Sequence, residues 1–267
     1  MTRHSYVLPE QKLVVFWTPK AACSSVAEAV ARSVLSAKEL KNLTPDSGGP
    51  RVLLNQLGYM KSGPEGRQIA EKRGYQSWAV IRDPYDRLIS AYINKFVTYN
   101  NRPIYTYRDM EPFAFQFVRD NAKALGLRRK PSLRNKWMGM SFRCFVTTVC
   151  DVIDKTPDRG RALNQHWNTQ IPEAFRKAEF DFDNVYILKT INRFFKTLEA
   201  ETGVALQIPK RNVSPYKIEI RQNYCDLSSL EILEKDGFSK RCFNDPDLRA
   251  RVKRSFKTDY HYIQKAA

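Results

Sequence analysis

The sequence predicts an α/β protein built on a parallel sheet, because three buried strands are each followed by a helix. Residues 13–17, 76–81 and 184–188 are short runs rich in β-branched and aromatic residues. Such runs are typical of strands that a parallel sheet buries on both faces. The helix expected over 192–202 ends before Gly203, a common helix stop. This alternation of strands and helices predicts a three-layer α/β/α domain with a central parallel sheet.

The loop after the first strand has the residues of an anion-binding site. A Thr-Pro pair ends the strand, because proline donates no hydrogen bond to a sheet. Ser24 and Ser25 are expected to form the N-cap of a helix over 26–31. The N–H groups and dipole of that helix, Lys20 and two hydroxyls would then converge on a phosphate or sulfate group. The glycines of a Walker A loop are absent, so an ordinary βα turn is the alternative.

The second strand ends at Arg82, on the edge where open α/β sheets bind ligands. Asp83 is expected to cap a helix whose first residue is Pro84. Apolar positions recur there at helical spacing and predict a core face made of Tyr85, Leu88, Ile89, Tyr92 and Phe96. A different, polar face carries Arg87, Ser90 and Asn94.

The remainder of the chain alternates predicted helices with polar loops. Residues 43–66 are rich in Pro, Gly, Asn and Ser and predict a surface loop. Apolar periodicity predicts further helices over 111–125, 141–153, 227–233 and 246–262. Between them lie an aromatic loop, a loop with a His-Trp pair and two basic segments, at 99–107, 164–167, 127–136 and 210–217. No repeat or linker divides the chain, so one domain over residues 1–267 is expected.

Charge and composition narrow the classes of partner. Lys and Arg outnumber Asp and Glu by 45 to 28, which gives a net charge of +17. Such an excess favours nucleic acid, an anionic membrane surface, a phosphorylated nucleotide or an acidic polysaccharide. The five cysteines form no Cys-x-x-Cys motif, and the three histidines form no His-Glu-x-x-His motif. A reduced, intracellular protein without a metal is therefore expected.

The absence of recognisable targeting segments in this sequence also favours an intracellular protein. No apolar run approaches the ~18 residues that a membrane span needs. The first five residues lead into no signal-peptide core. A soluble, cytoplasmic protein is expected, with a shortened chain as the alternative.

Two motifs resemble those of the sulfotransferases that use 3′-phosphoadenosine 5′-phosphosulfate (PAPS). Residues 18–25, Thr-Pro-Lys-Ala-Ala-Cys-Ser-Ser, resemble the 5′-phosphosulfate loop of that family, and residues 81–92 resemble its 3′-phosphate element. The pair 166–167 and the segment 254–260, which ends in Asp-Tyr, are similar to two shorter family signatures. The nearest likeness is to the carbohydrate sulfotransferases, which include the chondroitin and dermatan 4-O-sulfotransferases. The resemblance implies a P-loop-like nucleotide-binding fold.

The resemblance also implies a donor site in two halves. It assigns the 5′-phosphosulfate to Lys20, Ala21, Ala22, Cys23, Ser24 and Ser25. It assigns the 3′-phosphate to Arg82 and Ser90, and arginine suits that role because its planar fork grips phosphate bidentately. Arg211 and Ser214 are further donor-binding candidates, with a plain surface loop as the alternative.

The implied reaction moves the sulfuryl group of PAPS to a hydroxyl or amine, with adenosine 3′,5′-bisphosphate (PAP) as product and no metal. Lys20 would stabilise the charge that grows on the leaving oxygen. His166 is the candidate base, because histidine is the side chain best suited to proton transfer near neutral pH. A structural histidine is the alternative, and the substitutes for the base are Glu28, Asp109 and Glu111.

The acceptor stays open at the level of sequence. The basic and aromatic segments 128–136 and 99–107 favour a carbohydrate or glycoconjugate, and among these an acidic one. A lipid, a small metabolite and a peptide tyrosine are alternatives, whereas nucleic acid is not expected. Two other functions are a non-enzymatic polyanion-binding module and a nucleotide-dependent phosphotransferase. The second lacks Walker A glycines and an evident carboxylate pair for Mg²⁺.

Overall fold

The computed structural model describes residues 4–41, 49–127, 131–156, 163–206 and 222–266. It separates the chain into two units, each with its own contacts. Unit 1 comprises Met1–Asp83, Gln170–Val213 and Thr258–Ala267. Unit 2 comprises Pro84–Thr169 and Ser214–Lys257.

Unit 1 is built on a five-stranded sheet with the strand order β3-β1-β2-β4-β7. The strands are β1 (His4–Leu8), β2 (Leu13–Trp17), β3 (Met60–Lys61), β4 (Gln76–Ile81) and β7 (Asn184–Ile187). The three strands expected from the sequence run parallel, with Val15 opposite Trp78 and Val80 opposite Tyr186. β1 pairs antiparallel with both β2 and β3. The sheet is therefore mixed and not purely parallel, because only four residues join β1 to β2 and so short a connection allows only an antiparallel pair.

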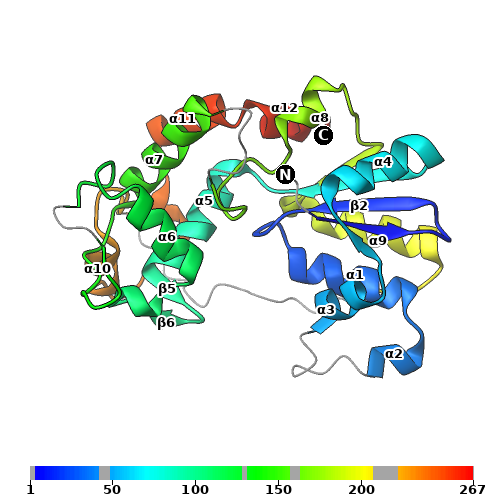
Figure 1. The fold of residues 1–267 in the computed structure, drawn as a ribbon, viewed down its shortest axis with the longest axis horizontal. Helices are drawn as coiled ribbons and strands as arrows, with labels where there is room; N and C mark the ends of the chain where they lie inside the picture. The colour runs from blue at the N-terminus through cyan, green and yellow to red at the C-terminus, as the bar shows by residue number, and fades with distance from the viewer. Residues whose placement is uncertain (1–3, 42–48, 128–130, 157–162, 207–221, 267) are drawn as a thin grey trace. The chain divides into compact units, whose positions relative to one another are not determined.

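Helices cover both faces of this sheet, which confirms the three layers for unit 1. One face carries α1 (Cys23–Val34), α3 (Gly49–Gln56) and α9 (Ile191–Thr202). The other carries α4 (Gly63–Arg73), α8 (Glu173–Lys177) and α12 (Lys257–Lys265). Figure 1 shows α1 and α4 on opposite sides of β2. A short helix, α2 (Ala37–Lys41), follows α1.

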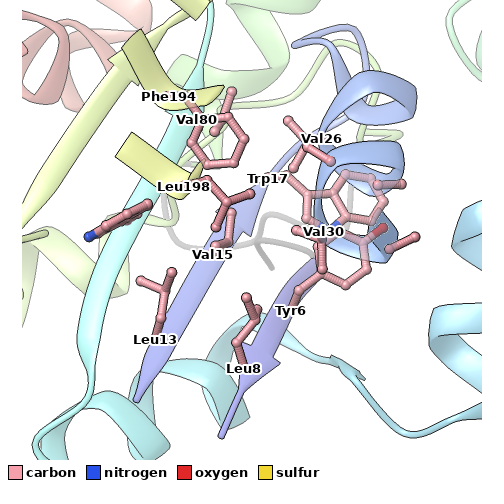
Figure 2. Packing of buried hydrophobic residues seen from close by; sticks show 14 of the residues in the cluster. Tyr6, Leu8, Leu13, Val15, Trp17, Val26, Val30, Val80, Phe194 and Leu198 are labelled. Carbon is pink, nitrogen blue, oxygen red and sulfur yellow. The ribbon is translucent and has the colours of Figure 1, made fainter. Parts of the chain in front are cut away.

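The alternation of side chains along β2 divides the core of unit 1 into two clusters. Leu13, Val15 and Trp17 pack toward α1 and α9, where they meet Val26, Val30, Phe194 and Leu198 (Figure 2). Val14 and Phe16 point to the other face. There the ring of Phe16 makes edge-on contacts with Phe175, Phe180 and Phe182. Both faces of β2 are thus buried, as its continuous apolar sequence predicts.

The prediction of a surface loop over 43–66 is wrong for the described part of that segment, which holds α3, β3 and the start of α4. The reason is that its proline and glycine residues serve as helix starts. Ser62 accepts a hydrogen bond from the Glu65 N–H, and the Glu65 carboxylate accepts one from the Ser62 N–H. This reciprocal capping box, with proline in the first turn, begins α4.

Unit 2 is mainly helical and has an aromatic core. Its helices are α5 (Pro84–Tyr92), α6 (Pro112–Asp120), α7 (Phe142–Lys155), α10 (Ser229–Leu233) and α11 (Pro246–Ser255). A π-helical turn (Ile93–Val97) continues α5. The five residues of the predicted core face of this helix are all 2% exposed or less. The ring of Tyr92 contacts those of Phe96, Phe142, Phe145 and Phe243.

Other helix bounds differ from the expected ones. The helix expected over 111–125 ends at Asp120. The segment 246–262 holds two helices, α11 and α12, because Phe256 leaves helical backbone. The aromatic loop 99–107 contributes to a small ribbon, in which β5 (Thr98–Tyr99) pairs with β6 (Arg102–Pro103). None of the helices among the described residues has the length and hydropathy needed to cross a membrane.

Candidate functional site

The loop between β2 and α1 passes twice through left-handed backbone. Lys20 has φ 67° and Ala22 has φ 56°, whereas Ala21 between them has a negative φ. Backbone nests that bind anions use left-handed residues of this kind to turn successive N–H groups toward one side. Left-handed backbone costs a residue with a Cβ atom roughly 1–2 kcal/mol. The strain concentrated here therefore has to be held by neighbouring contacts.

The N-terminus of α1 follows this loop directly. The helix begins at Cys23 and has Ala22 as its N-cap, with no side-chain cap and no acidic residue in the first turn. The predicted cap at Ser24 and Ser25 is wrong, because the left-handed turn at Ala22 starts the helix earlier and places both serines in its first turn. The first N–H groups of a helix have no partner within the helix, and its dipole is positive at this end. The start of α1 therefore favours an anion.

Arg82 follows the last residue of β4 and lies beside the same loop. Its side chain is buried, and Nη1 donates to the carbonyl oxygen of Lys20 over 3.0 Å. The ends of β2 and β4 therefore lie close enough for Arg82 to bond the backbone of Lys20. The guanidinium contacts the loop backbone, so Arg82 supports the loop as well as facing the edge.

Arg51, from α3, brings a second guanidinium to the start of α1. Its Nη2 lies 3.1 Å from Sγ of Cys23, and its guanidinium lies 4.8 Å from the ring centre of Trp17. Sequence reasoning missed this residue, because it falls in the segment expected to be a loop. The region around the loop therefore holds the positive charge of Arg51 in addition to that of Lys20.

Two further buried residues hold the backbone next to this site. The sequence analysis did not name either of them as a site residue. Gln170 bonds the main chain of Arg82 through its side-chain amide. Asp259 accepts hydrogen bonds from the main chain of Gln170 and Ile171. Asp259 belongs to the Asp-Tyr pair of the shorter C-terminal signature, the only sign of it in the sequence.

His166 belongs to unit 2, in the turn where the sequence placed it. Oδ1 of Asn164 accepts a hydrogen bond from the backbone N–H of His166 and lies 2.6 Å from Nδ1 of its ring. Because a backbone N–H can only donate, this side of the Asn164 amide must be the acceptor. Nδ1 therefore carries a proton, and the lone pair of the neutral ring lies on Nε2. Phe113 stacks on the ring, with the centroids 4.7 Å apart and the planes within 8°.

Arg87 holds the same turn from α5. The sequence placed it on a polar helix face, but it is fully buried. Its Nη1 donates to the carbonyl oxygen of Asn168 over 2.6 Å, and its Nη2 donates to that of Gln165. His166 thus sits between two backbone carbonyls that one rigid guanidinium fixes.

The three substitute base candidates already have charged or hydrogen-bonding partners. Glu28 pairs with Arg32 over 2.7 Å in α1, and Glu111 pairs with Lys95 over 2.5 Å in unit 2. Asp109 accepts hydrogen bonds in a capping box with Thr106.

The remaining predicted residues are distributed as follows. Ser90 lies half-buried on α5 and, like His166, belongs to unit 2. Arg211 and Ser214 lie outside the described residues. Within the described ranges, no three His, Cys, Asp or Glu side chains gather as metal ligands would.

One of three comparisons with known proteins gives a match. The model of the sulfotransferase family matches residues 3–263, which include the β2–α1 loop, Arg82 and His166. No curated protein and no solved structure matches the chain. The family match covers nearly the whole of the chain and extends over both units. The chain therefore belongs to the sulfotransferase family, whose members transfer sulfuryl groups.

Proposed function

We propose that this sulfotransferase takes the sulfuryl group from PAPS and transfers it to a hydroxyl or amine of a carbohydrate-like acceptor. The observation that carries the proposal is the strained loop at Lys20 and Ala22, which opens onto the start of α1 beside Arg82. Because the family match runs from residue 3 to residue 263 without a break, we treat residues 1–267 as one functional domain.

The donor carries anionic groups at both ends, and two kinds of site suit them. We assign the 5′-phosphosulfate to a P-loop-like cradle at the β2–α1 loop and the start of α1, made of backbone N–H groups, Lys20, Ser24 and Ser25. The 3′-phosphate is assigned to Arg82 and Ser90. Arg211 and Ser214 are proposed as further donor contacts on the family resemblance alone.

In the proposed reaction, the acceptor oxygen or nitrogen forms a bond to sulfur while the bond from sulfur to the bridging phosphate oxygen breaks in line. The electron pair of the broken bond stays on that oxygen, and PAP leaves. Lys20 stabilises this growing negative charge. His166 receives the acceptor proton at Nε2, the nitrogen whose lone pair the Asn164 contact leaves unprotonated.

The acceptor class is proposed from charge. A net charge of +17 favours an anionic acceptor, because attraction between opposite charges raises the local concentration of the ligand. A sulfated or uronate-bearing glycan is the carbohydrate that this charge selects.

Thermal unfolding with nucleotides tests the donor half of the proposal. We expect PAP to raise the melting temperature without added metal, because a ligand that binds only the folded state stabilises it. AMP, which lacks the 3′-phosphate, and ATP with Mg²⁺ are expected to do less. Equal stabilisation by ATP with Mg²⁺ would instead support a phosphotransferase. Steeply salt-dependent binding of heparin with no nucleotide effect would support a polyanion-binding module.

Transfer of labelled sulfate tests the acceptor half. The panel contains acidic and neutral glycans, a glycolipid, a phenol and a tyrosine peptide, each with labelled PAPS. The proposal expects label on an acidic glycan. Label only on the lipid, the phenol or the peptide would leave the sulfotransferase reaction standing and replace the acceptor class.

A further inference from the structure

Gln170 binds the backbone of Arg82 as a neighbouring strand would. Its Oε1 accepts from the Arg82 N–H over 2.9 Å, and its Nε2 donates to the Arg82 carbonyl oxygen over 2.7 Å. The Thr18 hydroxyl, directly after β2, donates to the same Oε1 over 3.4 Å. One fully buried side-chain amide therefore links the ends of β2 and β4, where the two strands lead into the candidate donor site.

Asp259 fixes the amide of Gln170. Its carboxylate accepts from the Gln170 N–H over 2.9 Å, from the Ile171 N–H over 3.0 Å and from Nε2 of Gln170 over 3.2 Å. The side chain is fully buried. A buried carboxylate is costly unless it is well bonded, and one that accepts several N–H bonds is held in a single orientation. Asp259 thus determines which way the amide of Gln170 faces.

Gln170 and Asp259 together form a clamp, in which their hydrogen bonds hold the backbone of Arg82. The position of these residues in the chain explains why that backbone needs a clamp. Arg82, Gln170 and Asp259 each lie within two residues of a point where the chain passes between unit 1 and unit 2, in one direction or the other. None of the three belongs to a strand. Side-chain hydrogen bonds replace the sheet ladder that would otherwise fix the backbone of Arg82.

We propose that Asp259 and Gln170 are positioning residues for the donor site, which act by fixing Arg82 and, through its bond to the Lys20 carbonyl, the strained β2–α1 loop. This inference rests on the proposed function and deepens it. Asp259 makes no contact with the donor in this scheme. Its carboxylate orients Gln170, Gln170 holds the main chain of Arg82, and Arg82 supports the loop.

Binding of PAP to Asp259→Asn tests the proposal. The amide cannot accept all of the N–H bonds that the carboxylate accepts, so we expect PAP affinity to fall at least about tenfold. In an Arg82→Ala background the same change should alter PAP affinity by less than about twofold, because residues that act through one another are not additive. Full additivity of the two effects would overturn the proposal. Asp181→Asn, an exposed carboxylate of the same unit, is the matched control.

Hydrogen exchange of the wild-type protein gives a test that needs no variant. If the clamp and the donor site are coupled, donor binding must stabilise the clamp by the same factor, since coupling is reciprocal. PAP is therefore expected to slow exchange of the amides of Arg82, Gln170 and Ile171. Slower exchange at the start of α1 without any change at these three amides would overturn the proposal, even if the variants fail to fold.

A failure of the proposed function is distinguishable from a failure of the clamp. If the wild-type protein does not bind PAP, the proposed donor is wrong. The clamp is then judged by amide exchange at residues 20–25 alone, which should speed up in Asp259→Asn and in Gln170→Asn but not in Asp181→Asn. Unchanged exchange there would overturn the clamp.

Discussion

Arg82 donates a hydrogen bond from its guanidinium to the backbone carbonyl of Lys20, 62 positions earlier in the chain, over 3.0 Å. The bond ties the residue after β4 to the loop after β2. It also acts on a residue whose φ of 67° is unfavourable for any side chain with a Cβ atom. Lys20 therefore has two roles that substitutions can separate. Its side chain is proposed to act in the reaction, and its backbone carries conformational strain.

Lys20→Ala and Lys20→Gly separate these two roles. Both remove the cation, so both are expected to lower kcat by about 10²–10³-fold with little change in the KM of the acceptor. Lys20→Gly should be more stable than Lys20→Ala by about 1 kcal/mol, because glycine adopts positive φ without strain. Steady-state sulfate transfer and urea unfolding measure the two effects.

Lys72→Ala, an exposed lysine of α4 in the same unit, is the control and should leave kcat unchanged. Near-normal turnover in Lys20→Gly would remove Lys20 from the chemistry. Equal stability of the two variants would show that the left-handed backbone is not a source of strain.

Asn164→Asp tests whether His166 is the base. A carboxylate at Nδ1 stabilises the protonated ring, which raises the pKa of His166. The neutral, proton-accepting form then becomes dominant only at higher pH. We therefore expect the acidic limb of the profile of kcat/KM against pH to move to higher pH than in the wild-type enzyme.

Asn135→Asp adds the same charge at an exposed position of unit 2 and should leave the limb in place. His166→Ala should abolish the limb. If the limb persists in His166→Ala, another group is the base and the role of Asn164 is structural.

The sequence predicts those parts of the fold that local patterns determine. β2 and β4 are largely buried apolar runs, whereas β7 has a single buried residue, and each of the three strands was expected within one residue of its observed bounds. β1 was missed, because its five residues mix polar and apolar types and depend on pairing with β2. The start of α4 was missed for a different reason: proline and glycine indicate a loop and a helix start equally well.

The residues of the candidate site also fall into those that local sequence identifies and those that it does not. The β2–α1 loop and Arg82 could be found because they lie at strand ends that local sequence defines. Gln170 and Asp259 could not be placed beside Arg82, since their hydrogen bonds join residues 88 and 89 positions apart. Arg51 falls in a segment whose helix was not predicted. Long-range contacts of this kind leave no periodic pattern in the sequence.

Gly66→Ala should destabilise the folded protein through a steric clash. An added Cβ would lie 2.2 Å from Oγ and 2.8 Å from Cβ of Ser5, where α4 packs on β1. Overpacking of this kind costs roughly 1–3 kcal/mol. Urea unfolding measures the loss. Adding Ser5→Gly removes both clashing atoms and is expected to restore part of the stability, whereas a loss that Ser5→Gly does not reduce would rule out this contact as the cause.

Arg143 gives unit 2 a pH-dependent stability. Its guanidinium binds Asp226 over 2.6 Å and Asp245 over 2.7 Å. Hydrogen bonds from Arg143 lower the pKa of Asp226. Burial opposes ionisation of Asp245, but hydrogen bonds from the Leu248 N–H and from Arg143 outweigh burial and lower its pKa as well. A carboxylate with a lowered pKa stabilises the fold above its ordinary pKa near 4, and that stabilisation is lost as the pH falls through the lowered value.

Arg143→Met removes these bonds and should lower the free energy of unfolding at pH 7 by about 1 kcal/mol, a modest value because Arg143 is partly exposed and Asp226 largely so. The gap to the wild-type protein should narrow toward pH 3, where protonation weakens the same bonds in the wild type. Urea unfolding at the two pH values measures it, with Arg134→Met, an exposed arginine of unit 2, as the control. A gap of the same size at pH 7 and pH 3 would mean that Arg143 acts through packing of its aliphatic stem and not through its charge.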